Sequence, residues 1–350
     1  MKKAVIIAGV LLILITIIYL SFNNNAIKED PRGKAYAGSK TCVSCHSNIY
    51  NSYIHTAHYI GSGQAAENTL HGSFSSGNNI FHINDSQKIV MEKLDSGFFQ
   101  SYYLNGKLEE RYRFDIVLGG VKGESYLYWK DNKLYQLPLS YFSREHQWST
   151  SPGYGFNFLA SASSRSIKKQ CLECHASYIS DLPAEEQGFN KEEKFDKSSL
   201  VVSIDCERCH GPAAEHADFQ THNPEVKTAH FITTYSSLNR SQKIDMCAIC
   251  HSGKPIDKLR STFEFVPGDS FSKFKIPELY TYVDTSRLDV HGNQLQLLQS
   301  SKCYTQSSLT CTTCHDVHQN TRGQDAVYVQ KCLACHNTSH KINCTMKDGL

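Results

Sequence analysis

The feature that most constrains this chain is a pentapeptide, Cys-x-x-Cys-His, that occurs six times in its 350 residues. Residues i and i+3 share one face of a helical turn, so both thiols of a motif can bond to one edge of a flat cofactor. The histidine that follows can then turn under the cofactor and bind a metal at its centre. This is the attachment pattern of c-type haem, and we therefore expect six covalently attached haems, each with its iron.

We number the motifs 1 to 6 in chain order, two cysteines and one histidine to each. The cysteines expected to form thioethers with haem are Cys42, Cys45, Cys171, Cys174, Cys206, Cys209, Cys247, Cys250, Cys311, Cys314, Cys332 and Cys335. The histidines expected to be the proximal iron ligands are His46, His175, His210, His251, His315 and His336.

Other uses of paired cysteines explain the pattern less well. A zinc ribbon accounts for CxxC pairs but leaves the histidine after every second cysteine without a role. A thioredoxin-like dithiol needs one copy, and disulfides explain neither the fixed spacing nor the histidine. The formal net charge of +2 gives no sign of a polyanion partner, so we expect no nucleic-acid binding.

The N-terminus predicts the compartment. Lys2 and Lys3 precede an uncharged apolar run from Ala4 to Phe22, which at ~1.5 Å per helical residue is long enough to cross a bilayer core. Residues 1–23 are therefore expected to be a transmembrane anchor, with a cleaved signal peptide as the alternative. The two lysines would keep the N-terminus in the cytoplasm, so the body would lie in the periplasm, anchored to the inner membrane.

The rest of the chain divides into four parts by its composition. Polar residues 24–40 are typical of a tether, and residues 41–71 form the first haem segment. Residues 72–148 contain short aromatic and β-branched runs separated by turn formers at Asp95, Asn105 and Asp131, which predict an antiparallel meander of five or six strands. Residues 149–350 hold the remaining five motifs.

The predicted fold class is α+β. Short helices and loops would pack on covalently bound haems, because the motif-rich segments have too few apolar runs for a core of their own. The antiparallel β-meander would be an insert, and the N-terminal transmembrane helix would precede the folded body.

Eleven of the 17 histidines lie outside the motifs and could supply sixth iron ligands. Two imidazoles saturate a haem iron and suit it to electron transfer, whereas a vacant position admits a substrate. The distal candidates are His58, His216, His291 and His318, with His340 as a weaker one. Competing or less favoured histidines are His55 beside His58, then His71, His146 and His230, while His82 and His222 are expected to be structural or solvated.

With these residues assembled, the chain resembles the cytochrome c-552/c-554 group of extracytoplasmic multihaem c-type cytochromes. The resemblance lies in GSKTCVSCHSNIYNSYIHTAHY, IDCERCHGPAAEH, MCAICHSG, LTCTTCHDVH and CLACH, and it covers nearly the whole chain beyond the tether. It implies haems in parallel-stacked and perpendicular pairs, electron transfer in respiratory or nitrogen-cycle metabolism, and His58, His216 and His318 as distal ligands. Relatives with four haems exist, and this chain departs from them by its six motifs and its strand-rich insert.

Cys303 and Cys344 remain once the motifs are assigned, and Cys303 stands where many relatives have methionine. Outside the cytoplasm such a pair can be oxidised, so we hypothesise a Cys303–Cys344 disulfide, with two free thiols or a thiol near iron as the alternatives.

The function expected from these residues is electron relay by a membrane-anchored hexahaem cytochrome, from a membrane-bound donor to an extracytoplasmic acceptor protein. The alternative is a multihaem reductase that acts on a small nitrogen or sulfur oxyanion at one five-coordinate haem. That haem would be the one at motif 4, because HSGKPIDKLR offers no nearby second histidine but offers Lys254, Lys258 and Arg260 to attract an anion. The sequence leaves carrier and enzyme both open, and no catalytic residue is assigned.

Overall fold

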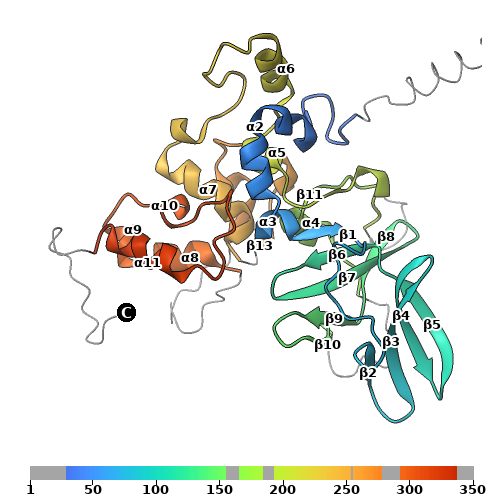
Figure 1. Ribbon diagram of the computed structural model, residues 1–350. Helices are drawn as coiled ribbons and strands as arrows, with labels where there is room; N and C mark the ends of the chain where they lie inside the picture. The colour runs from blue at the N-terminus through green and yellow to red at the C-terminus, as the bar shows by residue number, and fades with distance from the viewer. Residues whose placement is uncertain (1–28, 155–164, 184–192, 254, 278–291, 337–350) are drawn as a thin grey trace, which may run out of the picture.

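The computed structural model describes residues 29–154, 165–183, 193–253, 255–277 and 292–336. Helices and strands occupy different parts of the molecule, with the sheets on one side and the helical haem-motif segments on the other (Figure 1). Across the described ranges, no helix is long and apolar enough to cross a membrane. The predicted anchor, residues 1–23, lies outside those ranges and stays a prediction.

The strand-rich segment forms two antiparallel sheets. One is a four-stranded meander in the order β2-β3-β4-β5. The other is a six-stranded sheet in the order β1-β6-β7-β9-β10, with β8 paired to β7. The strands are β1 Ser62–Gln64, β2 Ile80–His82, β3 Gln87–Leu94, β4 Gly97–Leu104, β5 Lys107–Arg113, β6 Ile116–Gly119, β7 Gly123–Lys130, β8 Lys133–Gln136, β9 Leu139–Phe142 and β10 Gln147–Thr150.

The expectation of a single meander of five or six strands was wrong in number and layering, because the segment forms the nine strands β2 to β10 in two sheets, and strand β1 joins one of them from the first haem segment. The expected antiparallel pairing is confirmed, and so are the hairpin turns. Asn105 and Gly106 have φ of 50° and 79°, and Asp131 and Asn132 have φ of 51° and 60°. Both pairs of positive φ values match the tight two-residue turns that suit twisted hairpins.

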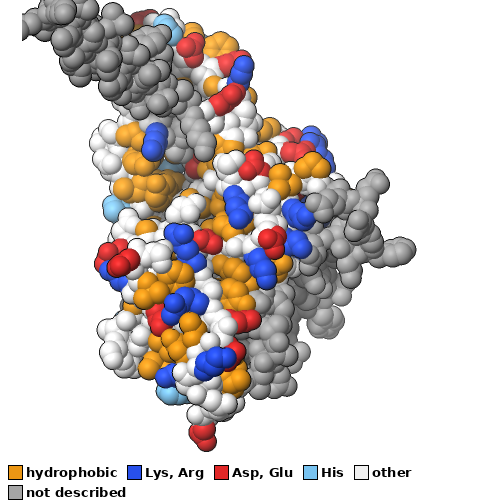
Figure 2. All heavy atoms as spheres, turned by 90° about the vertical axis from the view of Figure 1, so that its right-hand side faces the viewer, with side chains coloured by type: hydrophobic (Ala, Val, Ile, Leu, Met, Phe, Trp, Pro, Cys, Tyr) orange, Lys and Arg blue, Asp and Glu red, His pale blue; other side chains and the backbone are white. Residues whose placement is uncertain are grey.

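The two sheets enclose an aromatic core, to which alternate residues of the strands point. Met91 of β3 packs there with Val117, Tyr126 and Trp148 of the larger sheet. The residues next in sequence, Ile116 and Leu127, point to the opposite face, as the two-residue repeat of a strand requires. This second face packs on the segment of motif 2, as described below. Figure 2 shows the strand-rich side of the surface, where acidic and basic side chains are interspersed with apolar ones.

Short helices carry the motifs and the chain around them. They are α2 Ser39–Tyr53, α3 Ala57–Ile60, α4 Lys169–His175, α5 Cys206–His210, α6 Ala214–His222, α7 Arg240–His251, α8 Gln294–Gln299, α9 Lys302–Thr305, α10 Cys311–Cys314 and α11 Asp325–Leu333. Two further two-stranded antiparallel sheets lie among them, β11 Ala176–Tyr178 with β12 Val201–Val202, and β13 Pro255–Lys258 with β14 Lys275–Pro277.

Part of the predicted tether is docked on the body. The Arg32 side chain, 4% exposed, forms ion pairs with Asp30 at 2.8 Å, Asp205 at 2.7 Å and Glu207 at 3.2 Å. The Glu207 carboxylate also accepts hydrogen bonds from the backbone N–H groups of Ala37 and Gly38. These contacts fix the chain that enters α2 against motif 3.

Candidate haem-binding sites

The motif cysteines and histidines lie on helices or their last turns, as the i, i+3 spacing predicts. Motif 1 lies within α2, and motifs 2 to 4 end α4, α5 and α7. Motif 5 occupies α10 with His315 directly after it, and motif 6 begins near the end of α11. Local capping supports these starts: the Asp205 side chain accepts from the backbone N–H of Arg208 at 2.8 Å, and Asn239 forms a capping box at the start of α7.

Three motif histidines face a second imidazole. The ring centroids lie 6.5 Å apart for His46 and His216, 5.9 Å for His210 and His318, and 6.0 Å for His251 and His58. A metal lies about 2.0–2.1 Å from an imidazole nitrogen, which is itself about 1.1 Å from the ring centroid, so two imidazoles on opposite sides of one metal have centroids about 6.3 Å apart. The three pairs therefore have the spacing that one haem iron between two axial histidines needs.

Each distal histidine comes from a segment that follows a different motif. His216 on α6, after motif 3, faces motif 1, and His318, after motif 5, faces motif 3. His58 on α3, after motif 1, faces motif 4. The ring planes are nearly parallel in the first two pairs, at 17° and 16°, and nearly perpendicular in the third, at 87°.

The surroundings of two of these imidazoles favour the neutral, metal-binding form. Burial, together with the neighbouring rings, lowers the pKa of His210 and of His58 below the ordinary value. Hydrogen bonds fix the orientation of two others: His216 Nδ1 donates to the His230 carbonyl at 2.8 Å, and His251 Nδ1 donates to Gln294 Oε1 at 3.1 Å. Both leave Nε2 free for a metal.

Motif 4 departs from what the reductase hypothesis expected. His58 faces His251, so motif 4 has a second histidine close by, supplied by a distant segment. Two of the three cations expected to attract an anion are paired: Lys258 with Glu173 at 2.7 Å and Arg260 with Glu264 at 2.7 Å. Lys254 lies outside the described residues. The premise that motif 4 has no second histidine nearby was therefore wrong, and the structure does not support an open haem there.

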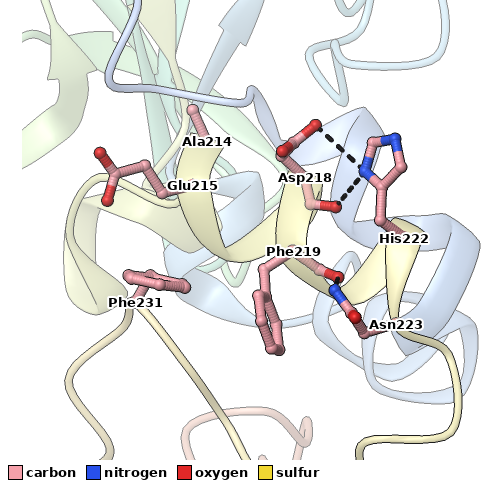
Figure 3. Close-up of a pocket in the computed structure, with 7 residues that line it drawn as sticks. All are labelled: Ala214, Glu215, Asp218, Phe219, His222, Asn223 and Phe231. Atoms are coloured by element: carbon pink, nitrogen blue, oxygen red, sulfur yellow. Dashed lines mark hydrogen bonds and ion pairs between the residues drawn. The ribbon is translucent and has the colours of Figure 1, made fainter.

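The other candidate histidines are placed differently. His222 on α6 turns to its own helix, where Nδ1 donates to the Asp218 carbonyl at 2.9 Å (Figure 3). His71 contacts the buried carboxylate of Glu124 instead of a motif, and His55 is exposed. His82 lies in β2, His146 in the turn before β10, and His230 packs on Phe219. The candidates His291 and His340 lie outside the described residues.

No imidazole faces His175, His315 or His336 among the described residues. Burial lowers the pKa of His175, whose segment packs on the larger sheet through Leu172, Ile116 and Leu127. His315 contacts the Tyr328 ring, with centroids 5.5 Å apart. Through the contacts of Leu172, the larger sheet is a direct neighbour of motif 2.

Cysteines of different motifs touch one another. The thiols of Cys42 and Cys206 lie close enough to interact, as do those of Cys174 and Cys250 and those of Cys247 and Cys311. These contacts join motif 1 to motif 3, motif 2 to motif 4, and motif 4 to motif 5. The Cys209 thiol of motif 3 lies within electrostatic range of the Cys250 thiol of motif 4. The Cys314 thiol of motif 5 lies within electrostatic range of both thiols of motif 6.

Cys209 of motif 3 is exposed to solvent. Burial among the neighbouring protein atoms nevertheless raises the pKa of its thiol to about 11. Free thiols and the spacing of the facing imidazoles together fit haem at motifs 1, 3 and 4.

Charged residues inside motifs 2 and 3 were missed by the sequence reasoning. Glu173, Glu207 and Arg208 are 2%, 3% and 8% exposed although they occupy the variable positions of CxxCH. Arg208 donates to the carbonyls of Thr262 at 2.8 Å and Glu173 at 3.0 Å, which ties motif 3 to motif 2. The signal was present, because these two motifs carry charged residues where the other four carry apolar, serine or threonine residues.

Comparison with known proteins agrees with these sites. A family model described as "Cytochrome c554 and c-prime" matches residues 147–211, which contain motifs 2 and 3. A search of curated proteins gave no match.

Two solved structures are similar over most of this chain. The outer cell wall cytochrome OcwA has a TM-score of 0.46 at 18% identity, over 90% of this chain and 58% of that one. The undecaheme cytochrome from the S-layer of Carboxydothermus ferrireducens has a TM-score of 0.40 at 18% identity, over 89% and 44%. The chain thus spans about half the length of these structures. This chain is therefore similar to multihaem c-type cytochromes in its six CxxCH motifs, two of which lie within the family match.

Proposed function

We propose that this chain is a hexahaem cytochrome that relays electrons outside the cytoplasm and is held at the inner membrane by residues 1–23. It would take electrons from a membrane-bound donor and pass them to an acceptor protein in the periplasm. The observation that carries the relay function is the set of three facing imidazole pairs, because an iron with two axial histidines has no position left for a substrate.

Haem supplies reversible one-electron chemistry at its iron, and the residues of this chain would set its position and potential. The cysteine contacts bring motifs 1 and 3, 2 and 4, and 4 and 5 together, so cofactors attached there would lie side by side. Motif 4 has two of these three contacts, with Cys174 and with Cys311. We infer that electrons moving between motifs 2 and 5 pass through motif 4.

The reductase alternative now rests on another motif. Among the described residues His175 of motif 2 faces no imidazole, and its ring is accessible to solvent although burial lowers its pKa. An open iron at motif 2 would be the place where a small oxyanion could bind. His291 and His340, which lie outside the described residues, are the remaining candidates to close it.

One experiment tests both functions. The haem content of the purified protein is measured as the pyridine haemochrome, and EPR spectra of the oxidised protein are then recorded with and without nitrite and nitric oxide. Six haems per chain with only low-spin signals, unchanged by either ligand, are expected for a relay. A high-spin signal that responds to a ligand would contradict a pure relay and favour the reductase.

A further inference from the structure

The end of α2, the helix that carries motif 1, contacts the histidine that faces motif 3. The Ser52 hydroxyl donates to the backbone carbonyl of His318 at 2.7 Å. The next residue, Tyr53, places its ring edge against the His318 ring, with centroids 5.9 Å apart and planes at 63°. Tyr53 is 7% exposed, so this contact lies inside the fold. Two adjacent residues of α2 therefore touch the backbone and the ring of one ligand candidate.

The same tyrosine reaches the chain that leads into motif 3. The Tyr53 hydroxyl donates to the Ile204 carbonyl at 2.6 Å, just before Cys206 begins the motif. Burial raises the pKa of Tyr53, so the phenol keeps its proton and stays a donor. Ile204 is held in turn, because its own N–H donates to the His58 carbonyl at 3.1 Å. Tyr53 thus joins the segment that leads to His210 with the ring that faces His210.

The orientation of the His318 ring depends on these contacts. Nδ1 hydrogen bonds orient two of the other facing imidazoles, but in the described part of the chain no hydrogen bond reaches a ring nitrogen of His318. Its backbone N–H donates to Asp316 Oδ1 at 2.9 Å, which holds the loop and not the ring. The anchor from Ser52 and the packing of Tyr53 are left to orient the ring. Its plane lies 16° from that of His210.

We propose that Ser52 and Tyr53 are positioning residues for motif 3. They hold the His318 ring nearly parallel to that of His210, across the iron of an attached haem. The proposal deepens the proposed function and rests on it, because it needs haem at motif 3. Residues that orient a metal ligand tune the metal without touching it. One helix then serves two sites: its motif binds one haem, and its last two residues orient the ligand of another.

The test is EPR of the oxidised holoprotein and its variants, after the pyridine haemochrome has shown equal haem content. The motif 3 signal is the low-spin signal that is lost in His318→Ala. Ser52→Ala removes one hydroxyl, Tyr53→Phe removes the other and keeps the ring, and Tyr53→Leu removes the ring. The planes start nearly parallel, so the loss of a contact turns them apart. A wider angle raises the highest g value, and we expect the largest rise in Tyr53→Leu.

Two matched variants separate positioning from a general loss of packing. Ser52→Thr keeps a hydroxyl and should have the wild-type g values. Tyr50→Phe removes a hydroxyl one turn earlier on α2, where it faces the Tyr59 hydroxyl at 3.5 Å, and should also leave the motif 3 signal unchanged. Unfolding in guanidinium is measured in parallel. If Ser52→Ala and Tyr53→Phe lose stability but keep the wild-type g values, their role is structural and the proposal is overturned.

Failure of this proposal is distinguishable from failure of the relay function. A wild-type high-spin signal that responds to nitric oxide contradicts the pure relay, but the signal that depends on His318 is still read in the same spectrum. A signal that depends on His318 and is unchanged in all three variants overturns the positioning role alone. A wild-type protein with no such signal overturns the ligand assignment at motif 3 and the positioning role with it.

Discussion

The imidazole planes of His58 and His251 cross at 87° with their centroids 6.0 Å apart, whereas the His46–His216 and His210–His318 planes lie within 17° of parallel. The angle between two axial imidazoles shapes the EPR spectrum of a low-spin iron, because it changes the splitting of the iron d orbitals. Near-perpendicular rings give a larger highest g value than near-parallel rings. A haem at motif 4 would therefore be distinguishable from haems at motifs 1 and 3.

Replacing His58 should affect that signal alone. In His58→Ala the low-spin signal of the perpendicular type is expected to disappear, and a high-spin signal from one haem that binds nitric oxide should replace it. His55→Ala is the control, since His55 is exposed three residues away. Loss of the signal in His55→Ala with retention in His58→Ala would exchange the roles of the two histidines.

His216 and His222 allow the same comparison on one helix. His216 faces His46, whereas His222 donates to the carbonyl of Asp218 in its own helix. We expect His216→Ala to convert one low-spin haem of the parallel type to high spin, as measured by EPR and by the visible absorption spectrum. His222→Ala should leave both spectra unchanged, and an equal effect of the two substitutions would contradict the assignment.

Arg32 should contribute strongly to stability. Its 4% exposed guanidinium group pairs with Asp30, Asp205 and Glu207, and removal of one partner from a buried ion pair costs about 3–5 kcal/mol. Arg32→Gln is expected to lower the free energy of unfolding in guanidinium, followed by far-UV circular dichroism, by that amount. Arg260→Gln, which breaks an exposed i, i+4 pair with Glu264, should cost about 0.3–0.5 kcal/mol.

The same group of charges gives a pH dependence. Burial alone would raise the pKa of Asp30, but hydrogen bonds from Arg32 and its charge outweigh burial and hold the pKa below the ordinary 3.8. A carboxyl group with a lowered folded-state pKa stabilises the fold above its unfolded pKa, and this contribution is lost as the pH falls through the folded value. Unfolding measured between neutral pH and pH 3 should therefore show a smaller acid loss in Asp30→Asn than in the wild type.

The proposed Cys303–Cys344 disulfide can be tested by alkylation. Cys303 is exposed on α9, and Cys344 lies outside the described residues, so the pair stays a prediction. Alkylation of the denatured holoprotein, followed by mass spectrometry, should find neither residue modified until a reductant is added. Two modified cysteines without reductant would show free thiols.

The attachment residues could be predicted from the sequence because their geometry is local. Two cysteines three residues apart and an adjacent histidine are already set by one helical turn, and the hairpin turns at Asn105 and Asp131 depend on two residues each. The sequence also suggested His58, His216 and His318 as distal ligands. It could not assign them to motifs 4, 1 and 3, because each pairing joins segments far apart in the chain.

What the sequence could not reveal depends on tertiary packing. The strand pattern indicated antiparallel strands, but whether Ile116 and Val117 face one core or two depends on which layers cover the sheet. Lys275 lies in an unremarkable exposed-looking segment, KFKIP, and only the packing of β14 near Cys174 and Cys250 buries it. The prediction for motif 4 failed for the same reason. It considered only histidines close to His251 in sequence, whereas His58 is close to His251 only in the folded chain.

Each of the three motif histidines faces a histidine from a distant segment of the chain, and this has a consequence for how the protein matures. A chain made from its N-terminus has the motif 4 ligands, His58 and His251, as soon as residue 251 exists, and the motif 1 ligands once His216 exists. Motif 3 must wait for His318, more than a hundred residues after His210. Irons held by these pairs would therefore become saturated in an order that differs from the order in which their attachment sites are made, and a chain that stops early would leave motif 3 open.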